Sequence, residues 1–155
     1  GAAGMYETTM VAILVSAICA LIQKYDGFTA LLNFIRRIFK TQKGGKLGMG
    51  LLVGAMDIAT ANNTVAIFMA NPIAKEMAEE YDVTPQTTAS ILDTFSCVFQ
   101  GVIPYGAQML IAISTAAELG FEFSAFDIMP NLYYPYILLI SALFYMFLAP
   151  KKKTK

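Results

Sequence analysis

The sequence predicts an all-α integral membrane protein, on the strength of its composition and its long apolar segments. Of the 155 residues, 57% are hydrophobic and 14% are charged, and the mean hydropathy is +0.58. Soluble domains carry about 25% charged residues, so this composition is typical of the membrane class. Several apolar runs are long enough, as helices, to cross a hydrocarbon core of about 30 Å. The lipid bilayer is therefore the first expected partner.

The charged residues are balanced in number but segregated along the chain. There are 11 basic and 11 acidic residues, and the basic ones gather in 36–46 and 151–155. A net charge of zero gives no electrostatic case for a nucleic-acid partner. The chain has no histidine, so a proton carrier would have to be Asp or Glu. Cys19 and Cys97 lie in apolar segments without metal-ligand spacing, so we expect small buried side chains and no cofactor.

Two helices are predicted in the first third of the chain. Residues 5–23 form an apolar run of about 19 residues, enough for one spanning helix. Residues 28–40 are amphipathic and too short to span, and their basic face suits a helix that lies along the bilayer surface. The predicted apolar face is made by Phe28, Leu31, Leu32, Ile35, Ile38 and Phe39, and the polar face by Thr29, Asn33, Arg36, Arg37 and Lys40. Gly44 and Gly45 are expected to separate this helix from the next element.

Residues 47–81 are predicted to form a re-entrant hairpin. Between 47 and 70, Asp57 is the only charged residue, and small and polar residues from Thr60 to Thr64 favour an unwound tip. A helix over 47–59 would be only about 20 Å long, too short to cross the bilayer. We expect Asn71-Pro72 to break the return arm before an amphipathic exit helix. Non-helical backbone is tolerated at this depth where it lines a cavity.

The alternative is a single spanning helix over 47–70, and the charge distribution distinguishes the two. Basic loops stay in the cytoplasm. With a hairpin, one outward crossing and one return crossing, both basic segments and the C-terminus fall on the cytoplasmic side. With a full span they fall on opposite sides. The charges therefore favour the hairpin.

The last part of the chain predicts a broken helix and a final span. Thr84-Pro85 is a helix start, and one helix over 85–117 would be about 50 Å long. Two glycines and a proline within Gly101–Gly106 predict two half-helices joined by exposed backbone, as in transporters with discontinuous helices. An acidic, Phe-rich loop should follow over 118–131. Residues 131–149 form the last span, with tyrosines at its interfaces.

Polar residues in these apolar segments are the candidates for chemistry, because a buried ionisable group in a membrane helix is costly unless it faces protein, water or an ion. Ser90, Asp93, Ser96, Cys97 and Gln100 form one stripe at helical spacing that would face the hairpin tip. The candidate ion- or substrate-binding residues are Asp57, Asn62, Asn63, Thr64, Asp93, Ser96, Cys97, Gln100, Gly101, Pro104 and Gly106. We expect Na⁺ at Asn62, Asn63, Thr64 and Asp93, with Asp93 as the titrating carboxylate and Asp57 in support.

Structural roles remain open for the same residues. The two aspartates could be paired within the bundle, and Asn62 and Asn63 could cap half-helices. For Ser90, Thr60 and Gln108, polar contacts between helices are the commoner explanation. For Cys97 we expect packing with at most a weak ligand role.

Two motifs resemble the Na⁺/H⁺ antiporter family of the NhaC type: Asp57-x-Ala-Thr-Ala-Asn-Asn-Thr-Val-Ala-Ile and Leu92-Asp93-x-x-Ser-Cys-x-x-x-Gly-x-Ile-Pro-Tyr-Gly-Ala-Gln108. The resemblance covers nearly the whole chain. It implies an ion transporter of inverted repeats with elevator-type motion. Each repeat of that superfamily has a spanning helix, a horizontal helix, a re-entrant hairpin, a broken helix and a final span. Asn62, Asn63 and Thr64 would be hairpin-tip ligands, and Gly101 to Gly106 the unwound segment.

The resemblance further implies one half of such a transporter. The antiporters are considerably longer, so the expected partner is a missing N-terminal repeat, and a homo-oligomer is also open. The expected function is Na⁺/H⁺ antiport in the bacterial inner membrane, with or without an organic solute. Alternatives are a carboxylate or amino-acid/cation antiporter of the same family, or a non-transporting half-subunit. An intramembrane aspartyl protease needs Gly-x-Gly-Asp, which neither Asp57 nor Asp93 has, so we expect no enzyme.

Overall fold

The computed structural model describes residues 24–148, together with residues 6, 10, 13, 14, 17, 18, 20 and 21, and every element in this part is helical. The all-helical prediction is confirmed for these residues. Much of the predicted span 5–23 lies outside the described residues, as does 149–155. The side chains of Phe28, Leu31 and Leu32 also lie outside the described part.

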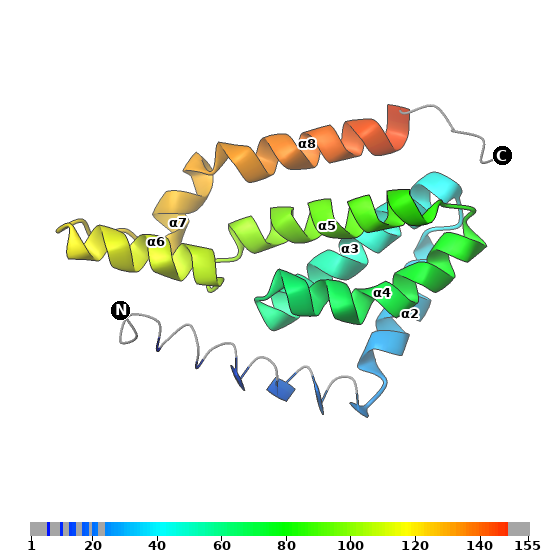
Figure 1. Ribbon diagram of the computed structural model, residues 1–155, viewed down its shortest axis with the longest axis horizontal. Coiled ribbons are helices and arrows are strands. Elements are labelled where there is room, and N and C mark those ends of the chain that lie inside the picture. Colours follow the sequence, from blue (N-terminus) through cyan, green and yellow to red (C-terminus); the bar gives the residue numbers. More distant parts are fainter. Residues whose placement is uncertain are drawn as a thin grey trace.

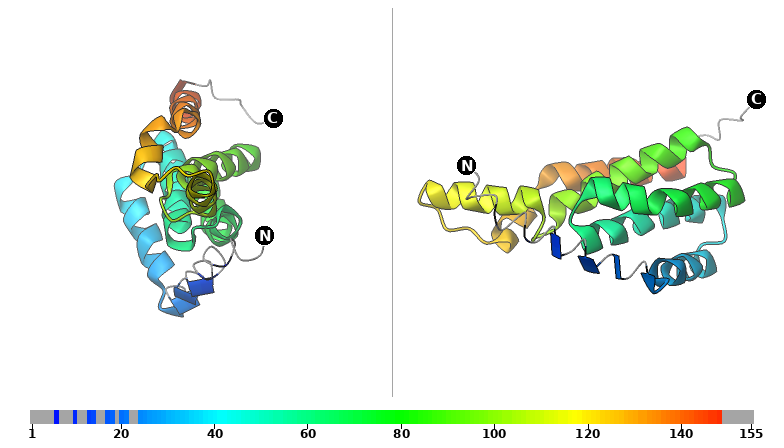
Figure 2. Two further views of the ribbon diagram at one scale, coloured as in Figure 1. Left: turned by 90° about the vertical axis from the view of Figure 1, so that its left-hand side faces the viewer. Right: turned by 60° about the horizontal axis from the view of Figure 1, so that its bottom comes forward.

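The described helices form a hairpin, a broken helix and a final helix packed side by side (Figure 1). Helices α3 and α4 make the hairpin, and α5 runs along it with α8 on its other side. Helix α6 continues beyond the hairpin on the line of α5, as Figure 2 shows from a second direction. The bounds are α2 Gly27–Ile38, α3 Gln42–Thr60, α4 Asn63–Glu80, α5 Pro85–Val102, α6 Ala107–Glu118, α7 Ala125–Ile128, the 3₁₀ helix η2 Met129–Asn131 and α8 Tyr133–Leu148.

Helix α3 begins earlier than the glycines suggested. The hydroxyl of Thr41 accepts a hydrogen bond from the backbone N–H of Gly44 at 3.1 Å, which caps the helix so that Gly44 and Gly45 form its first turn. The expected separation at these glycines is therefore wrong. Gly45 is needed for packing, because a Cβ there would lie 2.4 Å from the ring of Tyr81.

Glycines also bring α3 into close contact with α5. A Cβ on Gly50 would lie 2.7 Å from the ring of Phe95, and a Cβ on Gly54 would lie 2.4 Å from the ring of Phe99. Small residues that let two helices approach closely are the usual basis of helix association in membranes. Around this contact lies the buried core, which includes Met49, Leu52, Val53, Met56, Ile91, Leu92 and Phe95.

Helix α4 is continuous from the tip to its exit, so the predicted break at Asn71-Pro72 is wrong. Pro72 lies inside the helix on an exposed position. A proline removes one backbone hydrogen bond of a helix. This loss does not end α4 because its inner face is packed along its whole length by Ala66, Ala70, Ala74 and Met77, all fully buried.

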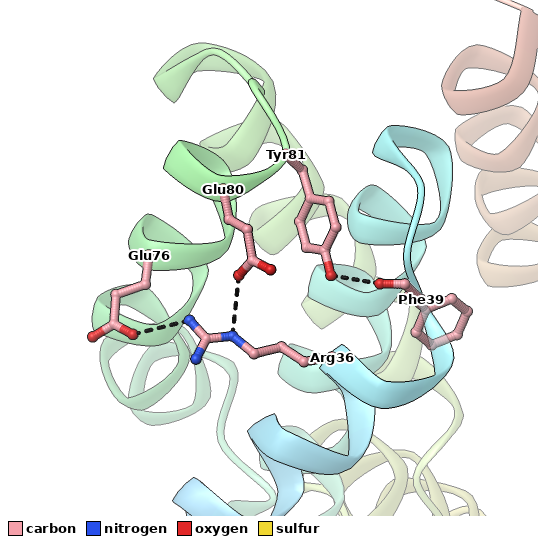
Figure 3. Close-up of polar contacts among 5 residues, drawn as sticks. All are labelled: Arg36, Phe39, Glu76, Glu80 and Tyr81. Atoms are coloured by element: carbon pink, nitrogen blue, oxygen red, sulfur yellow. Dashed lines mark hydrogen bonds and ion pairs between the residues drawn. The ribbon is translucent and has the colours of Figure 1, made fainter.

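Helix α2 is attached to the exit of the hairpin by polar contacts (Figure 3). Arg36 binds two carboxylates one turn apart on α4, with 3.2 Å from Nη2 to Glu76 Oε2 and 3.2 Å from Nε to Glu80 Oε2. The hydroxyl of Tyr81 donates to the carbonyl of Phe39. Burial and the neighbouring Glu80 raise the pKa of Tyr81, and Arg36 lowers it. The phenol is therefore a hydrogen-bond donor.

These contacts modify the prediction of a surface helix with two separate faces. Arg36 belongs to the predicted basic face, yet its guanidinium binds protein carboxylates. Of the predicted apolar face, Ile35 is buried and Phe39 is packed against the core, whereas Ile38 is exposed. The partner carboxylates on α4 lie forty or more residues away in sequence, so the periodicity of α2 alone carried no sign of them.

Within the described residues, one helix is long and apolar enough to cross a membrane. It is the 34-residue stretch Pro85–Glu118, made of α5 and α6. A second span would be Ala125–Asn131 with Tyr133–Leu148, which meet at an angle of 51°. The segment 118–131, expected to be a loop, contains α7 and η2. The backbone N–H of Ser124 donates to Asp127 Oδ2, the contact that the N3 carboxylate makes in a capping box, and the hydroxyl of Ser124 donates to the same oxygen.

The close approach of α3 and α5 predicts that Gly50→Ala destabilises the fold. The added methyl group would overlap the ring of the fully packed Phe95, and overpacking of this kind costs about 1–3 kcal/mol. Thermal unfolding of the purified protein in detergent measures the loss. The matched control is Gly44→Ala on the same helix, where the nearest atom would be 3.1 Å away. Equal shifts in Tm for the two variants would contradict the packing role.

Candidate functional site

The tip of the hairpin is a short turn between α3 and α4. Ala61 adopts a left-handed conformation with φ of 49°, and Asn62 is the N-cap of α4. The Asn62 side-chain oxygen accepts from the Val65 N–H at 3.2 Å, so one of its functions is to cap the helix. The hydroxyl of Thr60 donates to the carbonyl of Asn62 at 3.0 Å. The side chains of Asn62 and Thr64 remain exposed at the tip.

The break in the long helix lies at 103–106, where α5 has ended and α6 has not begun. The N–H of Gly106 donates to the carbonyl of Ile103 at 3.1 Å, which closes the turn around Pro104. Gly106 is the N-cap of α6 and provides no side-chain hydrogen bond to its first turn. The backbone N–H groups at the start of α6 are therefore not capped by a side chain of the described residues.

The structure brings the hairpin tip and the helix break together. The amide nitrogen of Gln100 donates both to the carbonyl of Ala61 at 3.2 Å and to the side-chain oxygen of Gln108 at 2.9 Å. The hydroxyl of Tyr105, within the break, donates to the carbonyl of Ile58. Two side chains from the broken helix thus hold backbone oxygens at the end of α3. The tip and the break form one continuous polar region.

Asp57 lies next to this region and is completely buried. It shares a face of α3 with Gly50, Gly54 and Ala61, at spacings of three and four residues, and those three contact α5. Its side chain therefore faces α5. Neither carboxylate oxygen has a hydrogen-bond partner among the described residues.

Gln100 contributes a third buried oxygen without a partner. Because its amide nitrogen makes both of the bonds described above, its side-chain oxygen is left free, and that oxygen is buried. Within the described chain, the two oxygens of Asp57 and this oxygen of Gln100 are the buried side-chain acceptors that receive no hydrogen bond. Buried acceptors without donors are costly, and a carboxylate among them requires a proton or a cation.

The polar stripe of α5 is divided by the packing. Ser96 and Gln100 are buried, and Ser96 donates its hydroxyl to the carbonyl of Asp93 at 3.1 Å. Asp93, Ser90 and Cys97 lie on the edge of the stripe that the described helices leave exposed. The expectation that Cys97 is buried is therefore wrong, because the helices packed on α5 do not cover this edge.

Of the two glycines of the predicted unwound segment, Gly101 lies outside the break and Gly106 lies within it. Gly101 is still helical, and a Cβ there would lie 3.0 Å from the ring of Pro135 on α8, so it serves helix packing. Gly106 and Pro104 do lie in the break. Tyr105 and Gln108 hold the site together. From the sequence, Gln108 was a possible further ligand, with a polar contact between helices as the commoner explanation, and there was no specific signal for Tyr105.

No group of three or more His, Cys, Asp or Glu side chains that could hold a metal ion occurs in the described part of the chain. A cation at this site would therefore be held by single carboxylate, amide, hydroxyl and carbonyl oxygens, the ligands of hard cations.

Comparison with known proteins gives a match to a protein family. The profile described as the Na⁺/H⁺ antiporter family matches residues 1–149. No curated protein and no solved structure matches the chain.

The bonds of Gln100 predict that Gln100→Met loosens the hairpin tip. The variant keeps the length of the side chain but removes both donated hydrogen bonds, each worth about 1 kcal/mol. Backbone amides over 58–66 should then exchange with deuterium about fivefold faster in detergent. Gln86→Met, exposed at the start of the same helix, is the control and should leave exchange unchanged. Unchanged exchange in both variants would show that Gln100 does not hold the tip.

Proposed function

Because the chain belongs to the Na⁺/H⁺ antiporter family, we propose that it provides an ion site at which Na⁺ and H⁺ compete for the carboxylate of Asp57. Family membership establishes a membrane protein of cation/proton antiport. The choice of Na⁺, of the NhaC type within the family, and of the residues that act is the proposal. The single observation that supports it is the set of unpartnered buried oxygens on Asp57 and Gln100.

The chemistry of exchange follows from one carboxylate with two alternative occupants. When Asp57 is ionised, its oxygens and the Gln100 side-chain oxygen supply negative charge and hard ligands to a dehydrated Na⁺. When Asp57 is protonated, it is neutral and its O–H becomes a donor. A protonated Asp57 has no negative charge left to hold Na⁺, and a carboxylate that holds Na⁺ in a buried site does not also take up a proton. Na⁺ and H⁺ therefore exclude one another. The fully buried hydroxyls of Ser96 and Thr60, on the same two helices, are further candidate ligands.

This assignment differs from the one drawn from the sequence, which made Asp93 the exchanging carboxylate. The burial of the two side chains is the reason for the change, since Asp57 is fully buried and Asp93 is exposed. We assign Asn62, Asn63 and Thr64 to the outer part of the same ion path, because the tip carries them next to the break. Asp93 and Cys97 belong to the exposed edge of α5.

The exposure of Asp93 and Cys97 on this edge of α5 is an argument for a second half of the transporter that covers it. A carboxylate on the lipid-facing side of a spanning helix is costly, so such residues are normally covered by protein or water. We assign the cover of Asp93 to a second repeat, in agreement with the resemblance to inverted-repeat transporters. The bonds of Gln100 and Tyr105 support a tip and break that move as one unit during transport.

The arrangement of the charged ends supports a re-entrant hairpin over an ordinary span. The ammonium of Lys43 donates to the carbonyl of Phe147 at 2.9 Å, so the start of α3 lies beside the end of α8. The basic segment 36–46 and the C-terminal end of α8 then belong to one side of the membrane. By the positive-inside rule this side is the cytoplasm of a bacterial inner membrane.

The proposal predicts that Asp57→Asn abolishes exchange. An amide has neither the charge to hold Na⁺ nor the proton to release, so Na⁺-dependent proton flux in vesicles containing the transporter should fall to the level of empty vesicles. Glu79→Gln, an exposed carboxylate on α4, is the matched control and should keep normal flux. Thermal unfolding of Asp57→Asn, expected to be close to that of the original chain, separates loss of exchange from loss of fold.

Asp93→Asn distinguishes the two carboxylates. Our assignment allows a weakened apparent affinity for Na⁺ in this variant, with exchange still measurable at high Na⁺. If Asp93→Asn abolishes exchange at every Na⁺ concentration and Asp57→Asn does not, the exchanging carboxylate is Asp93 and the proposal fails.

A further inference from the structure

A cavity of about 220 Å³ lies between α5 and α8, close to the start of α3 and away from the ion site. Its lining combines hydroxyl groups with apolar side chains from both helices, among them Leu138 and Met146. The hydroxyl groups belong to Thr87, Ser90, Thr94, Ser141 and Tyr145. The start of α3 and the end of α8 lie at the same end of the molecule, which Figure 1 shows from the side.

Among the residues that the structure describes, Lys46 is the one charged residue that lines this cavity. Its side chain is half-buried, and it forms no ion pair with any residue of the described chain. Lys46 also lies near the N-terminus of α3, which has no acidic residue in its first turn. Cations are unfavourable at this end of a helix, where the backbone dipole is positive. The cavity thus combines an unpaired ammonium with several hydroxyl donors.

This combination is unsuited to a cation path and suited to an anion. No carboxylate of the described chain lines the cavity, so Na⁺ would meet Lys46 without any compensating charge from these residues. Phosphate groups, in contrast, are bound by ammonium and hydroxyl donors, and basic pockets between membrane helices bind lipid head groups. A free phosphate would leave the apolar side chains of the lining, such as Leu138 and Met146, without a contact. The glycerol and first acyl carbons of a lipid can pack against them.

The position of the cavity agrees with a lipid ligand. Helix α5 opens the membrane-spanning stretch at Pro85, and α8 ends at Leu148 near the same end. The ammonium of Lys43 binds a carbonyl in the last turn of α8 there. This end therefore lies at the level of the lipid head groups, where a phospholipid reaches the cavity from the bilayer.

We propose that this cavity binds the phosphate head group of an anionic phospholipid, with Lys46 as its charge partner and Thr94 as one of its hydroxyl donors. The lipid fills the space between α5 and α8 and stabilises their packing. The site is independent of the ion exchange assigned to Asp57.

The test measures lipid binding to the full transporter in neutral detergent. Phosphatidylglycerol is added in increasing amounts, and its affinity is read from the shift in Tm and from native mass spectrometry. Phosphatidylcholine and inorganic phosphate are the comparison ligands. The variants are Lys46→Gln and Thr94→Val, and the matched control is Lys40→Gln, an exposed lysine outside the cavity.

We expect phosphatidylglycerol to raise the Tm of the original chain and of Lys40→Gln. Loss of the ammonium should weaken its binding about fivefold in Lys46→Gln, the value for one lysine near a lipid surface. Thr94→Val keeps the shape of the side chain and should weaken phosphatidylglycerol binding less than Lys46→Gln does. It tests the same site if Lys46→Gln does not fold. Equal affinity in Lys46→Gln and Lys40→Gln would overturn the proposal. An equal Tm shift with inorganic phosphate or with phosphatidylcholine would also overturn it, since the site would then not select an anionic lipid.

Discussion

The structure depends on the contact between α3 and α5, where a buried carboxylate lies in a row of small residues. Gly50 and Gly54 remove the side chains that would hold the helices apart, and the rings of Phe95 and Phe99 fill the space they leave. Asp57 follows on the same face, so the packing that stabilises the hairpin also withdraws the carboxylate from water. Its burial without a hydrogen-bond donor is costly in the ionised state. The cost is relieved whenever a proton or a cation is bound.

The tip and the break extend this contact into a site. Gln100 binds the carbonyl of Ala61 and the side chain of Gln108, so one amide joins the hairpin to both halves of the broken helix. Its own oxygen is left without a donor on the buried side. At the opposite end of the hairpin, Arg36 and Tyr81 attach α2 to the exit of α4. The hairpin is therefore held at both ends by side chains from other elements.

The sequence predicted the helical class and the places where polar residues interrupt apolar helices, because these features are local. The run Thr60–Thr64 marked the region where α3 gives way to α4, and Pro104 marked the break before α6. The errors came from contacts between distant segments. Gly44, Gly45 and Pro72 look like helix breakers in isolation, yet the Thr41 cap, the ring of Tyr81 and the packed face of α4 keep them in helices.

The same distinction explains what was missed at the site. Helical periodicity placed Asp93, Cys97 and Gln100 in one stripe, but only the packing of α3 against α5 shows that Gln100 is buried while Asp93 and Cys97 are exposed. The most direct test of the account is the release of protons when Na⁺ is added to the purified transporter in weakly buffered detergent. The account predicts proton release that saturates with Na⁺ in the original chain and is absent in Asp57→Asn. Undiminished proton release from Asp57→Asn would contradict it.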